Sequence, residues 1–124
     1  MATVADVLAA VDRLAPLGLA ESWDNVGLLL GDRAREARRV LVSLDVSERT
    51  VDEADRLGAD VHLAHHPLLF RPVDRLTADT RAGRLALRCL AASRSSSAAT
   101  TGPSACRWRR GPSGWPARWP RRSG

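Results

Sequence analysis

The supply of large apolar side chains ends abruptly at Leu90, and this break limits what the chain can fold into. Residues 1–90 contain 17 Leu and 10 Val, whereas residues 91–124 contain no Leu, Val, Ile, Met or Phe. A segment without aliphatic side chains cannot bury enough apolar surface to offset the entropy lost on ordering its backbone. We therefore expect one folded domain over residues 1–90 and a disordered tail over residues 91–124.

The charge of the chain divides at the same place. The whole sequence has a formal net charge of +5, which taken alone suggests a nucleic-acid binder. Residues 1–90, however, hold 14 acidic and 12 basic residues, whereas residues 91–124 hold seven Arg and no acid. In the tail, Arg is interleaved with Trp108, Trp115 and Trp119. Binding of single-stranded nucleic acid by charge and stacking is therefore an alternative function, confined to the tail.

A change of reading frame would explain the tail without giving it a partner. Trp has the single codon TGG, so a Trp-Pro pair read one nucleotide earlier can become Leu-Ala. The tail contains two such pairs, Trp115-Pro116 and Trp119-Pro120. We hypothesise that residues after about Leu90 are the out-of-frame translation of a longer gene, and we favour this explanation over nucleic-acid binding.

The other global features are typical of a cytoplasmic protein. The sequence has no run of about 18 apolar residues, so we expect no transmembrane helix and no membrane partner. The first residues lack the basic region of a signal peptide. Cys89 and Cys106 could pair, but two cysteines alone do not indicate an oxidising compartment.

Three segments have the features of helices. Each follows a Ser or Thr that can cap a first turn, and the first two are closed by Pro or Gly. The predicted helices cover residues 4–14, the residues between Ser47 and Gly58, and a segment that begins at Thr77 or Thr80 and contains Leu85, Leu87 and Leu90.

Three short apolar runs predict strands, over residues 26–30, 39–44 and 61–64. From residue 39 onward the order is strand, helix, strand and helix, which is typical of parallel strands joined by a right-handed crossover. The fold class is therefore α/β, of which this chain holds an amino-terminal βαβ portion. The next element should be a strand, but the Ala-, Ser- and Arg-rich tail begins there.

Polar side chains lie where two of these strands end. Asp45 follows the second strand, and His65 and His66 follow the third. The carboxyl ends of parallel strands meet at one edge of a sheet, where ligands bind. Adjacent histidines there could each bind one metal ion of a pair. Asp45 could orient one imidazole without binding the metal itself. The alternatives are a polar loop for the two histidines and a turn cap for Asp45. His62 is expected at a partly buried strand position and not as a ligand.

Three short segments together resemble one protein family. Residues 23–28 (WDNVGL), 43–46 (SLDV) and 64–70 (AHHPLLF) match, in order and spacing, the amino-terminal part of the NIF-three-like family. These are dinuclear-metal proteins, often labelled GTP cyclohydrolase 1 type 2 homologues. The resemblance covers about residues 3–90. Without it, residues 23–25 would be interpreted as a turn with a packed indole.

The resemblance implies an assembly, a cofactor and a reaction. Family members are α/β proteins that form toroidal hexamers, in which two divalent metal ions (Zn, Fe, Mn, Ni or Co) face an internal cavity. It implies one metal ligand from His65 and one from His66, and a hydrolytic reaction. The family also uses an aspartate shortly downstream and a His/Glu pair near its carboxyl terminus, but here no acid follows Asp79 and no His follows His66. We therefore expect a metal-binding but incomplete and inactive chain, lacking the half that would supply much of the hexamer interface.

Overall fold

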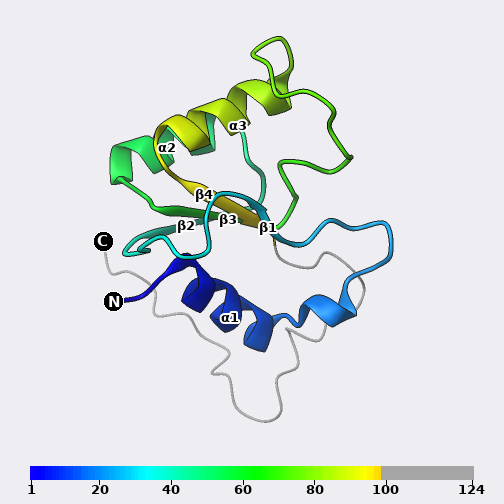
Figure 1. The fold of residues 1–124 in the computed structure, drawn as a ribbon, viewed down its shortest axis with the longest axis vertical. Coiled ribbons are helices and arrows are strands. Elements are labelled where there is room, and N and C mark those ends of the chain that lie inside the picture. The colour runs from blue at the N-terminus through cyan, green and yellow to red at the C-terminus, as the bar shows by residue number, and fades with distance from the viewer. Residues whose placement is uncertain (99–124) are drawn as a thin grey trace, which may run out of the picture.

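The computed structural model describes residues 1–98, which form a four-stranded sheet covered by helices on both faces (Figure 1). The strands lie in the order β1-β4-β3-β2. Helix α1 lies on one face of the sheet, and helices α2 and α3 lie together on the other. The elements are α1 (Val4–Leu14), a short 3-10 helix η1 (Leu17–Leu19), β1 (Gly27–Leu30), β2 (Val40–Ser43), α2 (Glu48–Leu57), β3 (Val61–Ala64), α3 (Arg81–Ala91) and β4 (Ser95–Ala98).

The strand pairing confirms the predicted α/β class. Strand β3 pairs in parallel with β2 on one side and with β4 on the other. The chain thus runs β2-α2-β3-α3-β4, with each helix joining parallel neighbours. Strand β1 pairs antiparallel with β4 and has a register shift between Leu28 and Leu30. The sheet is therefore mixed. The candidate residues follow the carboxyl ends of its parallel strands β2 and β3.

The predicted helix boundaries are confirmed by their caps. The hydroxyl of Thr3 accepts a hydrogen bond from the backbone of Asp6, and that of Ser47 from the backbone of Thr50, each within a capping box. Helix α2 ends at Gly58, which has φ +61°, the left-handed conformation that glycine adopts without strain. Of the two starts considered for the third helix, Thr80 is the capping residue.

Two apolar clusters hold the helices on the sheet. Under α1, the buried side chains are Val4, Leu8, Ala37 and Val61. Under α2 and α3, the buried side chains are Val46, Val51, Ala64, Leu85 and Cys89. Leu87 and Leu90 remain 39% and 44% exposed, because α3 turns the face that contains Leu85 and Cys89 toward the sheet.

The division of the chain at residue 90 is too early. Ser95, Ser96, Ser97 and Ala98 are buried in β4, between β1 and β3, so the fold continues eight residues beyond the predicted boundary. The backbone hydrogen bonds of a strand do not depend on aliphatic side chains, which is why the composition gave no sign of it. The rest of the predicted tail, with Cys106 and the three Trp residues, lies outside the described residues.

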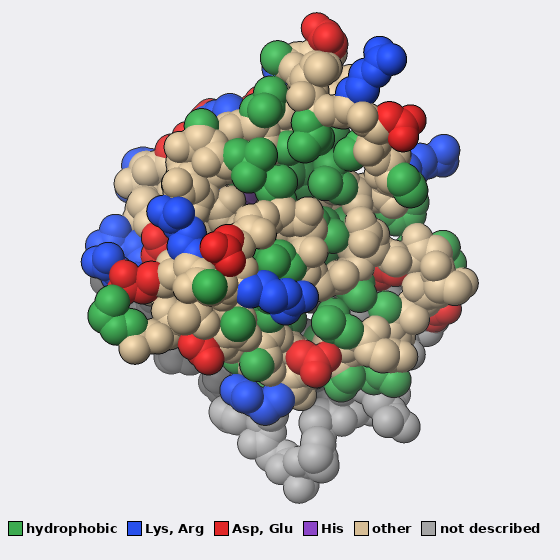
Figure 2. Space-filling model, in the orientation of Figure 1, with side chains coloured by type: hydrophobic (Ala, Val, Ile, Leu, Met, Phe, Trp, Pro, Cys, Tyr) green, Lys and Arg blue, Asp and Glu red, His purple; other side chains and the backbone are tan. Residues whose placement is uncertain are grey.

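The surface seen in Figure 2 mixes charged side chains with hydrophobic ones. Hydrophobic side chains gather in the upper part of this face, over the segment that joins β3 to α3. Phe70, Val73 and Leu76 in that segment are each more than a third exposed. None of the helices within residues 1–98 has the length and hydropathy needed to cross a bilayer.

Candidate metal centre

The structure brings the three predicted site residues to one edge of the sheet. The ladder between β2 and β3 continues past both strands, because the backbone N–H of His65 donates to the carbonyl of Ser43 (3.1 Å) and that of His66 to the carbonyl of Leu44 (2.8 Å). These bonds hold the two histidines beside Asp45, as expected at the carboxyl ends of parallel strands. The imidazole centroids lie 5.0 Å apart, with a 44° angle between the ring planes.

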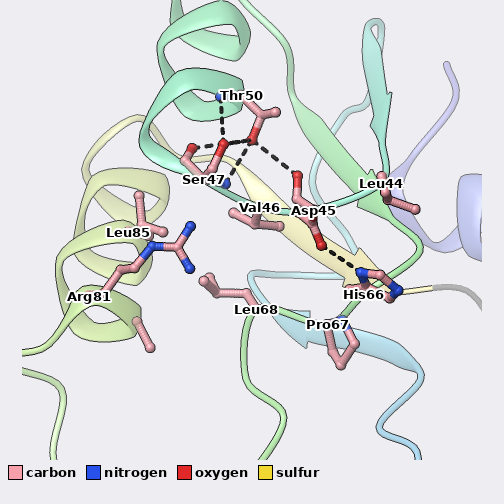
Figure 3. A pocket seen from close by; sticks show the side chains of 11 residues that line it. Leu44, Asp45, Val46, Ser47, Thr50, His66, Pro67, Leu68, Arg81 and Leu85 are labelled. Carbon is pink, nitrogen blue, oxygen red and sulfur yellow. Dashed lines mark hydrogen bonds and ion pairs between the residues drawn. The ribbon is translucent and has the colours of Figure 1, made fainter.

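Asp45 fixes the orientation of one imidazole. Its Oδ1 lies 2.6 Å from Nδ1 of His66 (Figure 3). An ionised carboxylate can only accept, so Nδ1 is the donor of this pair, and in the neutral ring Nε2 then has the lone pair. In Figure 3 the second ring nitrogen of His66 points away from Asp45. Metal-ligating histidines are commonly held in this way by a carboxylate on the other nitrogen.

The donor set of the described residues fits part of a divalent-metal site. Two neighbouring imidazoles, one of them held by a carboxylate, suit Zn, Fe, Ni or Co. Within residues 1–98, however, no three His, Cys, Asp or Glu side chains gather closely enough to hold a metal ion. A structural or catalytic zinc site needs at least three protein ligands. The described part of the chain therefore presents an incomplete ligand set.

The two most specific motifs contact each other beside this edge. The side-chain amide of Asn25 donates to the carbonyl of Leu69 (2.5 Å). The rings of Trp23 and Phe70 lie 6.3 Å apart at an angle of 47°. Trp23 is 58% exposed, so its indole packs at the surface and not in the core. The WDNVGL segment thus supports the loop that carries the histidines.

His62 is a structural residue, as the sequence indicated, although it is fully buried and not partly so. The hydroxyl of Ser43 donates to the carbonyl of Asp45 (2.6 Å) and accepts from Nε2 of His62 (2.7 Å). Burial lowers the pKa of His62, and the charge of Arg94 lowers it further. His62 is therefore neutral and ties the end of β2 to β3.

The structure adds a cavity that the sequence did not indicate. It has a volume of about 490 Å³ and opens between the histidine loop and the first turns of α2 and α3 (Figure 3). Its polar lining comes from Asp45, Ser47, Thr50, His66 and Arg81. Arg81 had no signal in the sequence, since only the packing of α3 against α2 brings it here. Cys89 is a free thiol within the core, and burial raises its pKa.

Comparison with known proteins gives consistent matches. A "GTP cyclohydrolase 1 type 2 homolog" of Clostridium perfringens is 43% identical over 79 residues, covering 64% of this chain and 30% of that protein. A protein of the same name from Streptomyces coelicolor is 44% identical over 85 residues, covering 68% of this chain and 30% of that protein. This chain therefore spans less than a third of the length of these relatives.

Solved structures agree with the sequence matches. The crystal structure of a Bacillus cereus protein related to NIF3 superposes with a TM-score of 0.75 and 35% identity, covering 79% of this chain and 27% of that one. The model of the Duf34/NIF3 (NGG1p interacting factor 3) family matches residues 2–100. Because that match covers most of the chain, and because the contacting motifs and the histidine edge lie within it, this chain belongs to the Duf34/NIF3 family.

Proposed function

We propose that this chain binds divalent metal ions through His65 and His66 and forms the amino-terminal part of a dinuclear centre. The observation that carries the proposal is the 2.6 Å contact between Asp45 and His66, beside a second imidazole at the carboxyl edge of a parallel strand pair. A carboxylate on Nδ1 fixes the tautomer and the orientation of the ring. This arrangement suits a metal ligand, because the lone pair of Nε2 must then point in one direction.

The role of each residue follows from its position. His65 and His66 would each donate one imidazole nitrogen, and Asp45 would hold the His66 ring without binding metal. When bound, a pair of divalent ions supplies Lewis acidity and lowers the pKa of a coordinated water. The relatives carry the name "GTP cyclohydrolase 1 type 2 homolog". We propose hydrolytic chemistry, a homohexamer and a cytoplasmic location for the whole protein, and metal binding without catalysis for this chain.

Titration of the full chain with Co²⁺, followed by its visible absorption, tests the proposal. A Cys106→Ser background removes the thiol that lies outside the described residues. His65→Ala and His66→Ala should each weaken Co²⁺ binding by about tenfold or more, since each removes one of two ligands. Unchanged affinity in the double variant would show that the metal binds elsewhere.

Variants of Asp45 test the positioning role. Asp45→Ala should weaken Co²⁺ binding by about tenfold, a loss typical of outer carboxylates. Asp45→Asn keeps an acceptor for Nδ1 and should retain part of the affinity. Asp74→Asn is the matched control, because Asp74 is exposed and lies outside the cavity lining. Equal affinities for all three variants would exclude Asp45 from the site.

A further inference from the structure

Strand β2 is an edge strand whose outer side is open within the described residues. It is the last strand in the order β1-β4-β3-β2. The carbonyls of Arg39 and Ser43 accept from the backbone of β3 and of the residue that follows it. Strand residues alternate, so the backbone groups of Val40 and Val42 point away from β3. Those N–H and C=O groups are left to water or to another strand.

The side chains of this edge are apolar and exposed. Val40 is 41% exposed, Val42 69% and Leu44 60%. Val40 and Val42 alternate along β2 and so share one face, the face on which Val61 of the neighbouring strand is buried under α1. Leu44 follows the end of the strand, and its carbonyl accepts from the backbone of His66. Edge strands are normally protected by charge, proline or a covering segment. Strand β2 contains neither a charged residue nor a proline, which makes it suited to pairing with another strand.

The residues on either side of Val42 complement each other in reverse order. Three positions before Val42 stands Arg39, and three positions after it stands Asp45. Two positions before it stands Val40, and two positions after it stands Leu44. In an antiparallel pair of two such segments, centred on Val42, Arg39 would lie opposite Asp45 and Val40 opposite Leu44, whereas Leu41 would lie opposite Ser43. Antiparallel self-pairing about a two-fold axis is the geometry that uses this order.

We propose that β2 is the contact between two copies of this chain, paired antiparallel with Val42 opposite its own counterpart. Val42 then forms a hydrogen-bonded pair, since its N–H and C=O point outward. Val40 lies opposite Leu44 of the partner, and Arg39 lies opposite Asp45 of the partner. The two four-stranded sheets become one continuous sheet. Centring on Val40 instead would set Arg39 opposite an apolar Leu41 and leave Asp45 unopposed.

Arg39 and Asp45 are free to make this contact without leaving their own. One guanidinium nitrogen of Arg39 donates to the carbonyl of Leu57, and its other donors remain. Only Oδ1 of Asp45 is used by His66. The interface shares Asp45 with the candidate metal centre, where it contacts His66. Val42 lies outside that centre, so a test at Val42 is independent of metal binding.

Disulfide trapping tests the register in the full chain with Cys106→Ser. Cα atoms of a hydrogen-bonded antiparallel pair lie about 5.5 Å apart, within the range for a disulfide. Val42→Cys should therefore form a disulfide-linked dimer in the presence of a mild oxidant. Val40→Cys, also exposed, is the matched control, since its counterpart would lie about 14 Å away along the strand. Equal cross-linking of both variants, or none of Val42→Cys, would overturn the proposal.

Charge reversal tests the same interface by sedimentation across a range of concentrations. Arg39→Glu and Asp45→Arg should each weaken dimerisation at least tenfold, because each sets like charges opposite one another twice. The double variant restores both pairs and should recover dimerisation. Val42→Arg should abolish it, whereas Val73→Arg, on another exposed segment, should not. A chain that sediments as a monomer at every concentration, or a double variant no better than the singles, would refute the pairing.

Discussion

Strands β3 and β4 lie side by side in the centre of the sheet and are almost equally buried, yet their side chains have opposite character. Strand β3 reads Val-His-Leu-Ala and β4 reads Ser-Ser-Ser-Ala. In β3 the one polar side chain, His62, bonds to Ser43 through one ring nitrogen. In β4 the hydroxyl of Ser97 donates to the carbonyl of Gly27, but the hydroxyls of Ser95 and Ser96 have no partner among the described residues.

The difference shows two ways in which a chain reaches the centre of a sheet. Strand β3 is placed by its side chains, which supply apolar surface to both clusters. Strand β4 is placed by its backbone, which pairs with β1 and β3, and by Arg94 just before it. Arg94 is 2% exposed and donates to the carbonyl of Ala59 (2.9 Å) and to Asp55 (2.7 Å). The small side chains of β4 also let the backbone at the end of β1 approach it closely, since Gly31 lies against Ser95.

The largest effect is expected where that close approach leaves no room. A Cβ on Gly31 would lie 2.3 Å from Oγ of Ser95 and 2.8 Å from its Cα, and Gly31 has φ +114°. Gly31→Ala should therefore lower the free energy of unfolding by about 3 kcal/mol or more, measured by urea denaturation. Gly18→Ala, with no atom within 4 Å, should change it by less than about 0.5 kcal/mol. Equal effects would refute the close packing of β4.

Placing a buried hydroxyl in β3 should measure the destabilisation that the unpaired hydroxyls of Ser95 and Ser96 cause in β4. Val61 is fully buried, so Val61→Thr adds an unpaired hydroxyl without changing the shape of the side chain. We expect a loss of about 2 kcal/mol in the free energy of unfolding. Val42→Thr, at a position 69% exposed, should cost less than about 0.5 kcal/mol. A Val61→Thr variant as stable as the parent would show that the added hydroxyl finds a partner or reaches solvent in β3.

The neutral His62 should make stability depend on pH. Its pKa is lowered in the folded chain, so below about pH 6.5 the unfolded chain binds a proton that the folded chain does not. The contribution of His62 to the free energy of unfolding is thus fully present above that pH. It falls as the pH decreases, by at most about 1.4 kcal/mol per pH unit. Urea denaturation between pH 7.5 and 5.5 measures the slope. His62→Gln should flatten it; an unchanged slope would assign the dependence to other groups.

The smallest effect is expected from removing a buried hydroxyl of β4. Ser96→Ala should stabilise the chain by about 1 kcal/mol, because the hydroxyl is buried and unpaired. Ser43→Ala should have the opposite sign, since its hydroxyl bonds to both His62 and the carbonyl of Asp45. Thermal unfolding of the two variants compares them. A loss of stability in Ser96→Ala would indicate a partner for that hydroxyl.

The composition of β4 also bears on the reading-frame hypothesis, which stays a prediction. Parallel strands covered on both faces normally read as aliphatic runs. Ser-Ser-Ser-Ala at such a place is in line with a frame change before Ser95. Sequencing the locus decides: an uninterrupted frame that encodes these same residues in ordinary family relatives would refute it.

Most elements could be predicted because their signals are local. Thr3, Ser47 and Thr80 cap helices by contacts within one turn, and Gly58 ends α2 through its own backbone conformation. Strand β4 could not be predicted, because its stability comes from pairing with residues 27–30 and 61–64, far away in the chain. The candidate histidines were found from their place after a strand, whereas Arg81 and the cavity depend on how two helices pack.

By itself, the sequence determined the family, the α/β class and the three polar residues of the sheet edge, because short-range periodicity, caps and contiguous motifs encode them. Only the tertiary structure decided that Asp45 contacts His66, that His62 is buried against Ser43, and that β4 completes the sheet. These facts join residues that are 19 or more positions apart. Their contacts depend on strand order and register, which no local segment specifies.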